Sequence, residues 1–100
     1  MSELQKIKLL WKGFLKQPFP QHLAGKEIEG IELALLDSFA AGCVSVFLER
    51  GRLDKEREVI LERCFRELSA VIPNLEDRDK PYFVELHSIS EKVLSNLTLN

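Results

Sequence analysis

The sequence predicts an all-α protein, a compact four-helix bundle formed by one domain that covers residues 1–100. The first observation is periodicity, because apolar residues recur every three to four positions in successive segments, as on a helix with one buried face. The second is that no segment alternates strictly between apolar and polar residues, as a half-buried strand would. Prolines and glycines divide the chain into these segments. We therefore expect helices at about 3–16, 26–50, 54–72 and 80–97.

The first, third and fourth predicted helices each have one apolar side and one polar side. In the first helix, lysines lie opposite an apolar arc that contains Leu4, Ile7, Leu10, Trp11, Phe14 and Leu15. Asp54 can cap the third helix with its side-chain oxygen, and Gly51 can end the second in a left-handed conformation. Asp79 opens the fourth helix as a candidate cap, and Pro81 follows in a first turn that tolerates proline.

The second predicted helix has a different outer side. Its apolar arc covers about half of the circumference, and the opposite stripe carries small residues instead of charges. The stripe consists of Ala34, Ser38, Ala41 and Ser45. Because small side chains let another backbone approach closely, we expect this helix to be central and touched on most sides. The first helix would cover the stripe in a monomer, whereas a second copy would meet it across a two-fold axis in a homodimer. The sequence leaves both arrangements open.

Composition and charge exclude several classes of protein. The formal net charge of −2, from 14 Lys and Arg against 16 Asp and Glu, does not indicate a nucleic-acid binder. A helix-turn-helix is excluded because the helix after Gly51 begins with acidic residues, which phosphates would repel. Two cysteines are too few for a disulfide-stapled secreted domain, and the first residues do not form a signal-peptide pattern. We expect a soluble, cytoplasmic protein that binds no nucleic acid.

Candidate catalytic and metal-ligating residues are few. His87 and Glu91 are four positions apart and could face one ion, but a closed zinc site needs four ligands. Glu29 and Glu32 could form a carboxylate pair, yet no nucleophile or histidine lies near them in the sequence. We therefore expect His87 to be structural and the two acids to mark a helix start. No metal, cofactor or catalytic activity is predicted.

The main functional hypothesis is contact with protein. We expect a small interaction or regulatory module without catalytic activity, which forms a homodimer and binds a protein partner that the sequence does not identify. One alternative is a small apolar ligand held between the helices. Its pocket would be formed by Glu32, Phe39, Cys43, Phe47, Cys64 and His87. The two cysteines in this set are otherwise expected to be buried and chemically inert.

A second alternative is peripheral attachment to a membrane through the basic first helix. Residues 1–26 carry five Lys and one Glu, a net charge of +4, whereas residues 27–100 carry nine Lys and Arg and fifteen acids, a net charge of −6. Trp11 and Phe14 on the apolar side of a basic helix are typical of interfacial membrane helices. The same pattern describes a helix that docks its apolar side on an acidic bundle. We favour docking, because so small a core needs that side to be complete.

Overall fold

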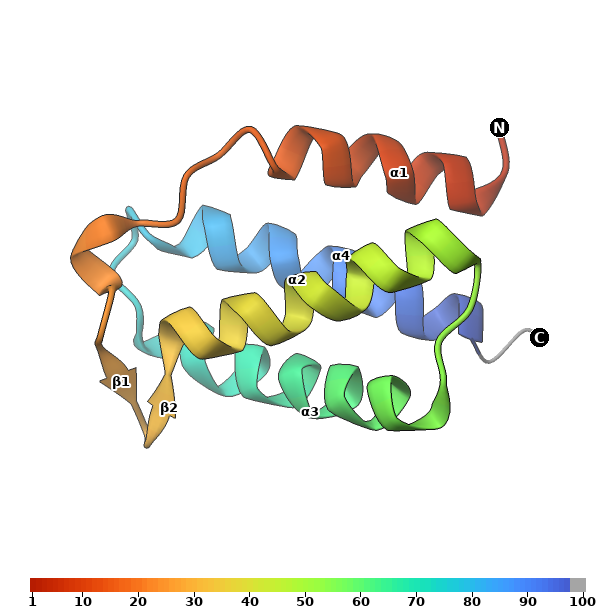
Figure 1. The fold of residues 1–100 in the computed structure, drawn as a ribbon. Coiled ribbons are helices and arrows are strands. Elements are labelled where there is room, and N and C mark those ends of the chain that lie inside the picture. The colour runs from red at the N-terminus through yellow and green to blue at the C-terminus, as the bar shows by residue number, and fades with distance from the viewer. Residues whose placement is uncertain (98–100) are drawn as a thin grey trace.

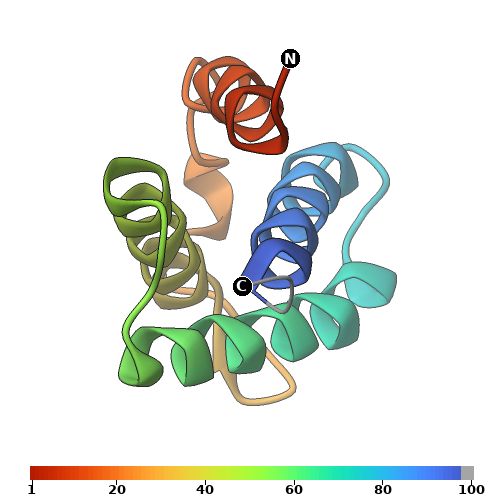
Figure 2. The same ribbon diagram turned by 90° about the vertical axis from the view of Figure 1, so that its right-hand side faces the viewer.

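The computed structural model describes residues 1–97, and these form four α-helices that pack on one another (Figure 1). The helices are α1 (Glu3–Phe14), α2 (Leu33–Arg50), α3 (Lys55–Val71) and α4 (Lys80–Leu97). Two short 3-10 helices, η1 (Gln21–Leu23) and η2 (Ile72–Asn74), lie in the connections. Figure 2 looks roughly along α1, α2 and α4, while α3 runs across them on the side opposite α1. The predicted all-α bundle is therefore confirmed.

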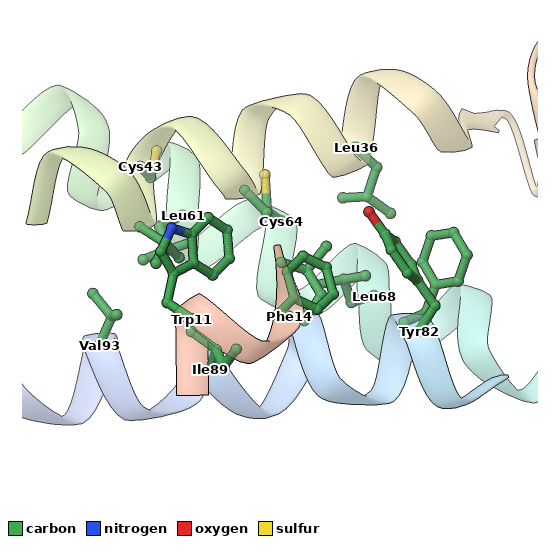
Figure 3. Packing of buried hydrophobic residues seen from close by; sticks show 14 of the residues in the cluster. Trp11, Phe14, Leu36, Cys43, Leu61, Cys64, Leu68, Tyr82, Ile89 and Val93 are labelled. Carbon is green, nitrogen blue, oxygen red and sulfur yellow. The ribbon is translucent and has the colours of Figure 1, made fainter. Parts of the chain in front are cut away.

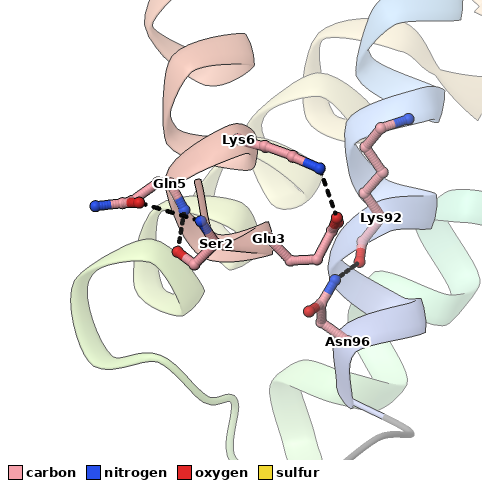
Figure 4. A network of polar contacts seen from close by, with 6 residues as sticks. All are labelled: Ser2, Glu3, Gln5, Lys6, Lys92 and Asn96. Carbon is pink, nitrogen blue, oxygen red and sulfur yellow. Dashed lines mark hydrogen bonds and ion pairs between the residues drawn. The ribbon is translucent and has the colours of Figure 1, made fainter.

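Local capping interactions fix the ends of three helices. The Ser2 hydroxyl accepts a hydrogen bond from the Gln5 backbone N–H, and the Gln5 side chain accepts one from the Ser2 N–H, which forms a capping box at α1 (Figure 4). Asp54 caps α3 by accepting from the Arg57 N–H at 3.2 Å. Gly51 ends α2 with φ of 77°, a conformation that costs glycine little. The predicted roles of Asp54 and Gly51 are both confirmed.

The predicted start of the second helix, at about residue 26, is wrong, because α2 begins at Leu33. The preceding residues form a small antiparallel hairpin of β1 (Glu27–Ile28) and β2 (Ile31–Glu32). Glu29 and Gly30 join the strands with φ of 52° and 79°, the signs that a tight two-residue hairpin turn requires. Strands of two residues are too short to show an alternation of apolar and polar residues in the sequence. The first helix also ends earlier than predicted, at Phe14 instead of about residue 16.

The apolar side of α1 is docked on the bundle through Ile7, Trp11 and Phe14, all of them buried. The Phe14 ring lies 4.7 Å from the Tyr82 ring of α4, centroid to centroid, and Trp11 stacks on Phe14 at 5.2 Å. Figure 3 shows these rings together with core residues of the other helices. Leu10 and Leu15, which the sequence places on the same apolar arc, remain 39% and 62% exposed. The docked strip of α1 is thus narrower than predicted.

The central position predicted for the second helix is shared with α4. α2 contacts all three other helices, but α1 lies mainly against α4 and reaches α2 at only a few positions. The reason is aromatic packing, because Phe14 packs on Tyr82, and Phe19 after α1 packs edge-on against Tyr82 and Phe83. α1 therefore follows α4, and the outer side of α2 is not covered by it.

Candidate functional site

The outer side of α2 is almost free of charge. From Leu33 to Leu48 the only charged residue is Asp37. Its carboxylate accepts a 2.7 Å hydrogen bond from the Tyr82 hydroxyl of α4, so it faces the bundle. The side chains that remain outside form a surface that we call the α2 outer face. It consists of Ala34, Leu35, Ser38, Phe39, Ala41, Gly42, Ser45 and Val46.

Two large apolar side chains stand out from the α2 outer face. Leu35 is 55% exposed and Phe39 is 47% exposed. Single exposed apolar residues are common on any protein, but here they lie one helical turn apart on a face without charges. Exposed apolar side chains grouped in this way are more informative about a contact surface than isolated ones.

Phe39 lies between two open grooves along the seam of α2 and α3. The first groove, about 260 Å³ in volume, is lined by Ser38, Phe39, Gly42, Cys43, Val46, Arg57 and Ile60. The second is lined by Gly30, Ile31, Glu32, Leu35, Leu36, Phe39, Arg63 and Glu67. Pockets that hold small molecules usually have volumes of about 300–1,000 Å³ and enclose most of the ligand. The two grooves, of about 260 and 230 Å³, are smaller than such pockets.

The predicted small-residue stripe lies on this face. Ser38 and Ser45 are exposed, while Ala34 and Ala41 are partly buried. Ala41 packs against the core. The first helix does not cover the exposed serines, so the monomer arrangement considered from the sequence leaves the stripe partly open. Gly42, which sequence reasoning missed, lies on the same face, and a Cβ atom there would meet nothing within 4 Å.

The structure does not bring the six residues of the predicted ligand pocket together. Phe39 and Cys43 line the first groove, and Glu32 lines the second. Phe47 and Cys64 are core residues, 3% and 1% exposed. His87 lies between α3 and α4, where its ring stacks on Phe65 at 4.3 Å and its Nε2 is 2.9 Å from the Ser69 hydroxyl. A ligand between the helices would therefore meet only part of the predicted set.

The two cysteines are free thiols in apolar surroundings (Figure 3). Burial raises the pKa of the Cys43 thiol, and its S–H donates a 3.6 Å hydrogen bond to the Arg57 carbonyl. Burial, with a smaller contribution from Cys43, raises the pKa of the Cys64 thiol to about 11. Since the thiolate is the reactive form, both groups are poor nucleophiles at neutral pH.

Glu32 and the pair formed by His22 and Asp79 have structural roles. Glu32, one of the paired-carboxylate candidates, caps α2 by accepting a 2.6 Å hydrogen bond from the Leu35 N–H. His22 is joined to the nearly buried Asp79 carboxylate, with Nε2 2.9 Å from Oδ1, which ties η1 to the start of α4. Within residues 1–97, no three His, Cys, Asp or Glu side chains come together as a metal ion would require.

None of the helices within residues 1–97 combines the length and the apolar character needed to cross a membrane. Comparison with protein-family models, with curated proteins and with solved structures found no match for this chain. The α2 outer face, with its grooves beside Phe39, is therefore identified as the candidate functional site from its own geometry.

Proposed function

We propose that this protein is a non-catalytic interaction module that forms a homodimer through the α2 outer face. The observation that carries the proposal is the exposure of Leu35 and Phe39 on a helix side that has no charge over four turns. Placing these apolar side chains against another molecule removes them from water, which is favourable in proportion to the area buried.

A second copy suits this surface because a projection and a hollow lie side by side on it. Phe39 projects, and the adjoining groove has small residues, Ser38 and Gly42, on its α2 side. Across a two-fold axis, each Phe39 can enter the groove of the other copy, as a self-complementary interface requires. The exposed Ser45 extends the small-residue surface along α2, where two helices can approach closely.

The chemistry of the described residues is consistent with a role in contact and not in catalysis. Cys43 and Cys64 have raised pKa values, and Glu32 caps a helix. The two buried thiols are free, which suits a reducing compartment such as the cytoplasm. A further protein partner would bind the dimer or compete for the same face.

The test is the mass of the protein in solution, measured by sedimentation velocity from about 1 to 100 µM, the range in which a modest interface associates. We expect a dimer for the unchanged chain and a monomer for Phe39→Glu, because the variant buries a carboxylate in the apolar contact. Val59→Glu is the matched control, since Val59 is 51% exposed on α3. It should leave the dimer intact.

Two results would contradict the proposal. One is a monomer at every concentration for the unchanged chain. The other is a dimer that Phe39→Glu leaves unaltered while circular dichroism shows that the variant is folded. If only the Val59→Glu variant dissociates, the contact is on α3 instead, and the assignment of the α2 outer face is wrong.

A further inference from the structure

A second surface, on α1, also has exposed apolar side chains, but it is rich in charge. With Ile7, Trp11 and Phe14 buried against the bundle, the other side of the helix faces outward. Met1 is 76% exposed, Leu9 57% and Leu15 62%. In Figure 2, α1 forms the outermost layer on its side of the bundle, and among the described residues no helix lies beyond it. These apolar groups therefore point away from the core.

Lysines surround the exposed apolar groups of α1. Lys8 and Lys12, with Gln5, line a shallow hollow together with Met1 and Leu9. Lys16 follows directly after the helix and is exposed. On an α-helical wheel, Lys8, Leu9 and Lys12 fall in one arc of α1, and the exposed Met1, Leu15 and Lys16 lie just beyond the two ends of the helix. We call these six residues the α1 outer surface.

One acidic group of α4 reaches the end of this surface, because the Glu85 carboxylate accepts a hydrogen bond from the Gln17 side chain. Glu3 is the only acid of α1, and its carboxylate lies 3.5 Å from the Lys6 ammonium group (Figure 4). The segment 1–26 has a net charge of +4, and the rest of the chain has −6. The molecule is therefore strongly polarised, so an anionic surface would attract α1 and repel most of the remaining bundle.

We infer that the α1 outer surface docks on the anionic phospholipid headgroups of a membrane. An anionic leaflet attracts each lysine near it by about 1 kcal/mol, and apolar side chains between the lysines can enter the boundary between headgroups and acyl chains. Exposed apolar groups beside the lysines favour a lipid surface, because it offers anionic headgroups and an apolar interior together.

The docking surface is separate from the proposed dimer face. The grooves beside Phe39 lie on the seam of α2 and α3, and α3 is on the side of the bundle opposite α1 (Figure 2). A Phe39→Glu variant that is monomeric should still bind lipid. Failure of either proposal therefore leaves the other intact.

The experiment is co-sedimentation of the full chain with vesicles at low salt. One set contains phosphatidylcholine with about 30% phosphatidylserine, an anionic composition at which juxtamembrane lysines bind, and the other contains phosphatidylcholine alone. We expect binding to the first set only, weakened by salt. The double variant Lys8→Gln/Lys12→Gln should lower the partition coefficient roughly 25-fold, the product of two losses of about fivefold for each lysine. Leu9→Ser should lower it several-fold.

Matched controls change the same chemistry elsewhere. Lys55→Gln/Arg66→Gln removes two exposed positive charges from α3, and Val59→Ser removes an apolar group with nearly the exposure of Leu9. Both controls should bind as the unchanged chain does. The inference is overturned if neither vesicle type binds, if both bind equally, or if the α3 controls lose as much affinity. Binding to soluble polyglutamate without binding to anionic vesicles would indicate an acidic protein as the partner of this surface. That result would also overturn the inference.

Discussion

α2 and α3 are consecutive helices of 18 and 17 residues, and each buries one side in the same core. Their outer sides differ. α3 exposes charged side chains along its length, among them Glu56, Glu62 and Arg66, and it exposes one large apolar residue, Val59. α2 exposes Leu35 and Phe39 among small uncharged residues. Since both helices need a buried side, the difference lies in their outer sides, which are charged on α3 and uncharged, with two large apolar residues, on α2.

The largest expected effect is the loss of stability when a core residue is truncated. It should be similar for α2 and α3, because both bury one side in the core. Phe47 of α2 is 3% exposed and Leu61 of α3 is 0% exposed. Replacing either residue with alanine should lower the free energy of unfolding by about 3–4 kcal/mol, because it removes apolar contacts and leaves a cavity. The measurement is urea denaturation followed by circular dichroism, in the Phe39→Glu background so that association does not contribute. A loss below about 1 kcal/mol at either position would show that its side of the helix is not core.

A smaller effect should come from the buried thiol of Cys64 on α3. The pKa of Cys64 is raised from its ordinary value of 9.0 to about 11. Below pH 9 the thiol is protonated in both states and the stability is complete. Between pH 9 and 11 the unfolded chain loses the proton while the folded chain keeps it, so stability falls as pH rises. We expect a loss of about 1–2 kcal/mol from this group, which is less than the full pKa difference implies because the surroundings relax.

The check is the free energy of unfolding measured from pH 8 to 10.5 for the unchanged chain and for Cys64→Ala. The variant has lower stability throughout because of the cavity, but its dependence on pH should be flatter. Tyr82, whose pKa is raised by burial and by its hydrogen bond to Asp37, contributes a loss of the same sign in both proteins. Equal slopes in the two proteins would show that the Cys64 thiol ionises as it does in the unfolded chain.

Much of this comparison could be predicted from the sequence, because helix periodicity and caps are local. The apolar sides of the helices, the Asp54 cap and the small-residue stripe are all set by spacings of a few residues. The hairpin before α2 was missed, since strands of two residues have no period. Which of the six residues of the ligand-pocket hypothesis share a groove could not be predicted, because this depends on how the helices pack. The tie between His22 and Asp79 joins residues 57 positions apart, and no sequence pattern indicates it.

A modest effect should follow from Gly42, which lies in the middle of α2 with open space where a Cβ would be. Gly42→Ala should raise the free energy of unfolding of the monomer by about 0.5–1 kcal/mol, because glycine is a poor helix former. If the proposed homodimer forms, the same methyl group should weaken it several-fold, since the second copy would approach at this position. Sedimentation equilibrium and urea denaturation measure the two quantities.

Gly13 provides the control, since it lies in α1, also has nothing within 4 Å of a Cβ, and is away from the α2 outer face. Gly13→Ala should not lower stability and should leave association unchanged. If Gly42→Ala and Gly13→Ala both leave the dissociation constant of the dimer unaltered, the two copies do not approach at Gly42.

The smallest expected effect concerns serine, which has opposite surroundings on α4 and on α2. Ser90 of α4 is fully buried, and its hydroxyl has no hydrogen-bond partner among the described residues. Ser38 of α2 is exposed to water. Ser90→Ala should therefore raise the free energy of unfolding by up to about 1 kcal/mol, because it removes a desolvated hydroxyl without changing the packed volume much. Ser38→Ala should change the monomer by less than about 0.5 kcal/mol. If urea denaturation shows that Ser90→Ala is destabilising, the hydroxyl has a partner, such as a backbone carbonyl or a buried water molecule, and the contrast between covered and open serines does not hold.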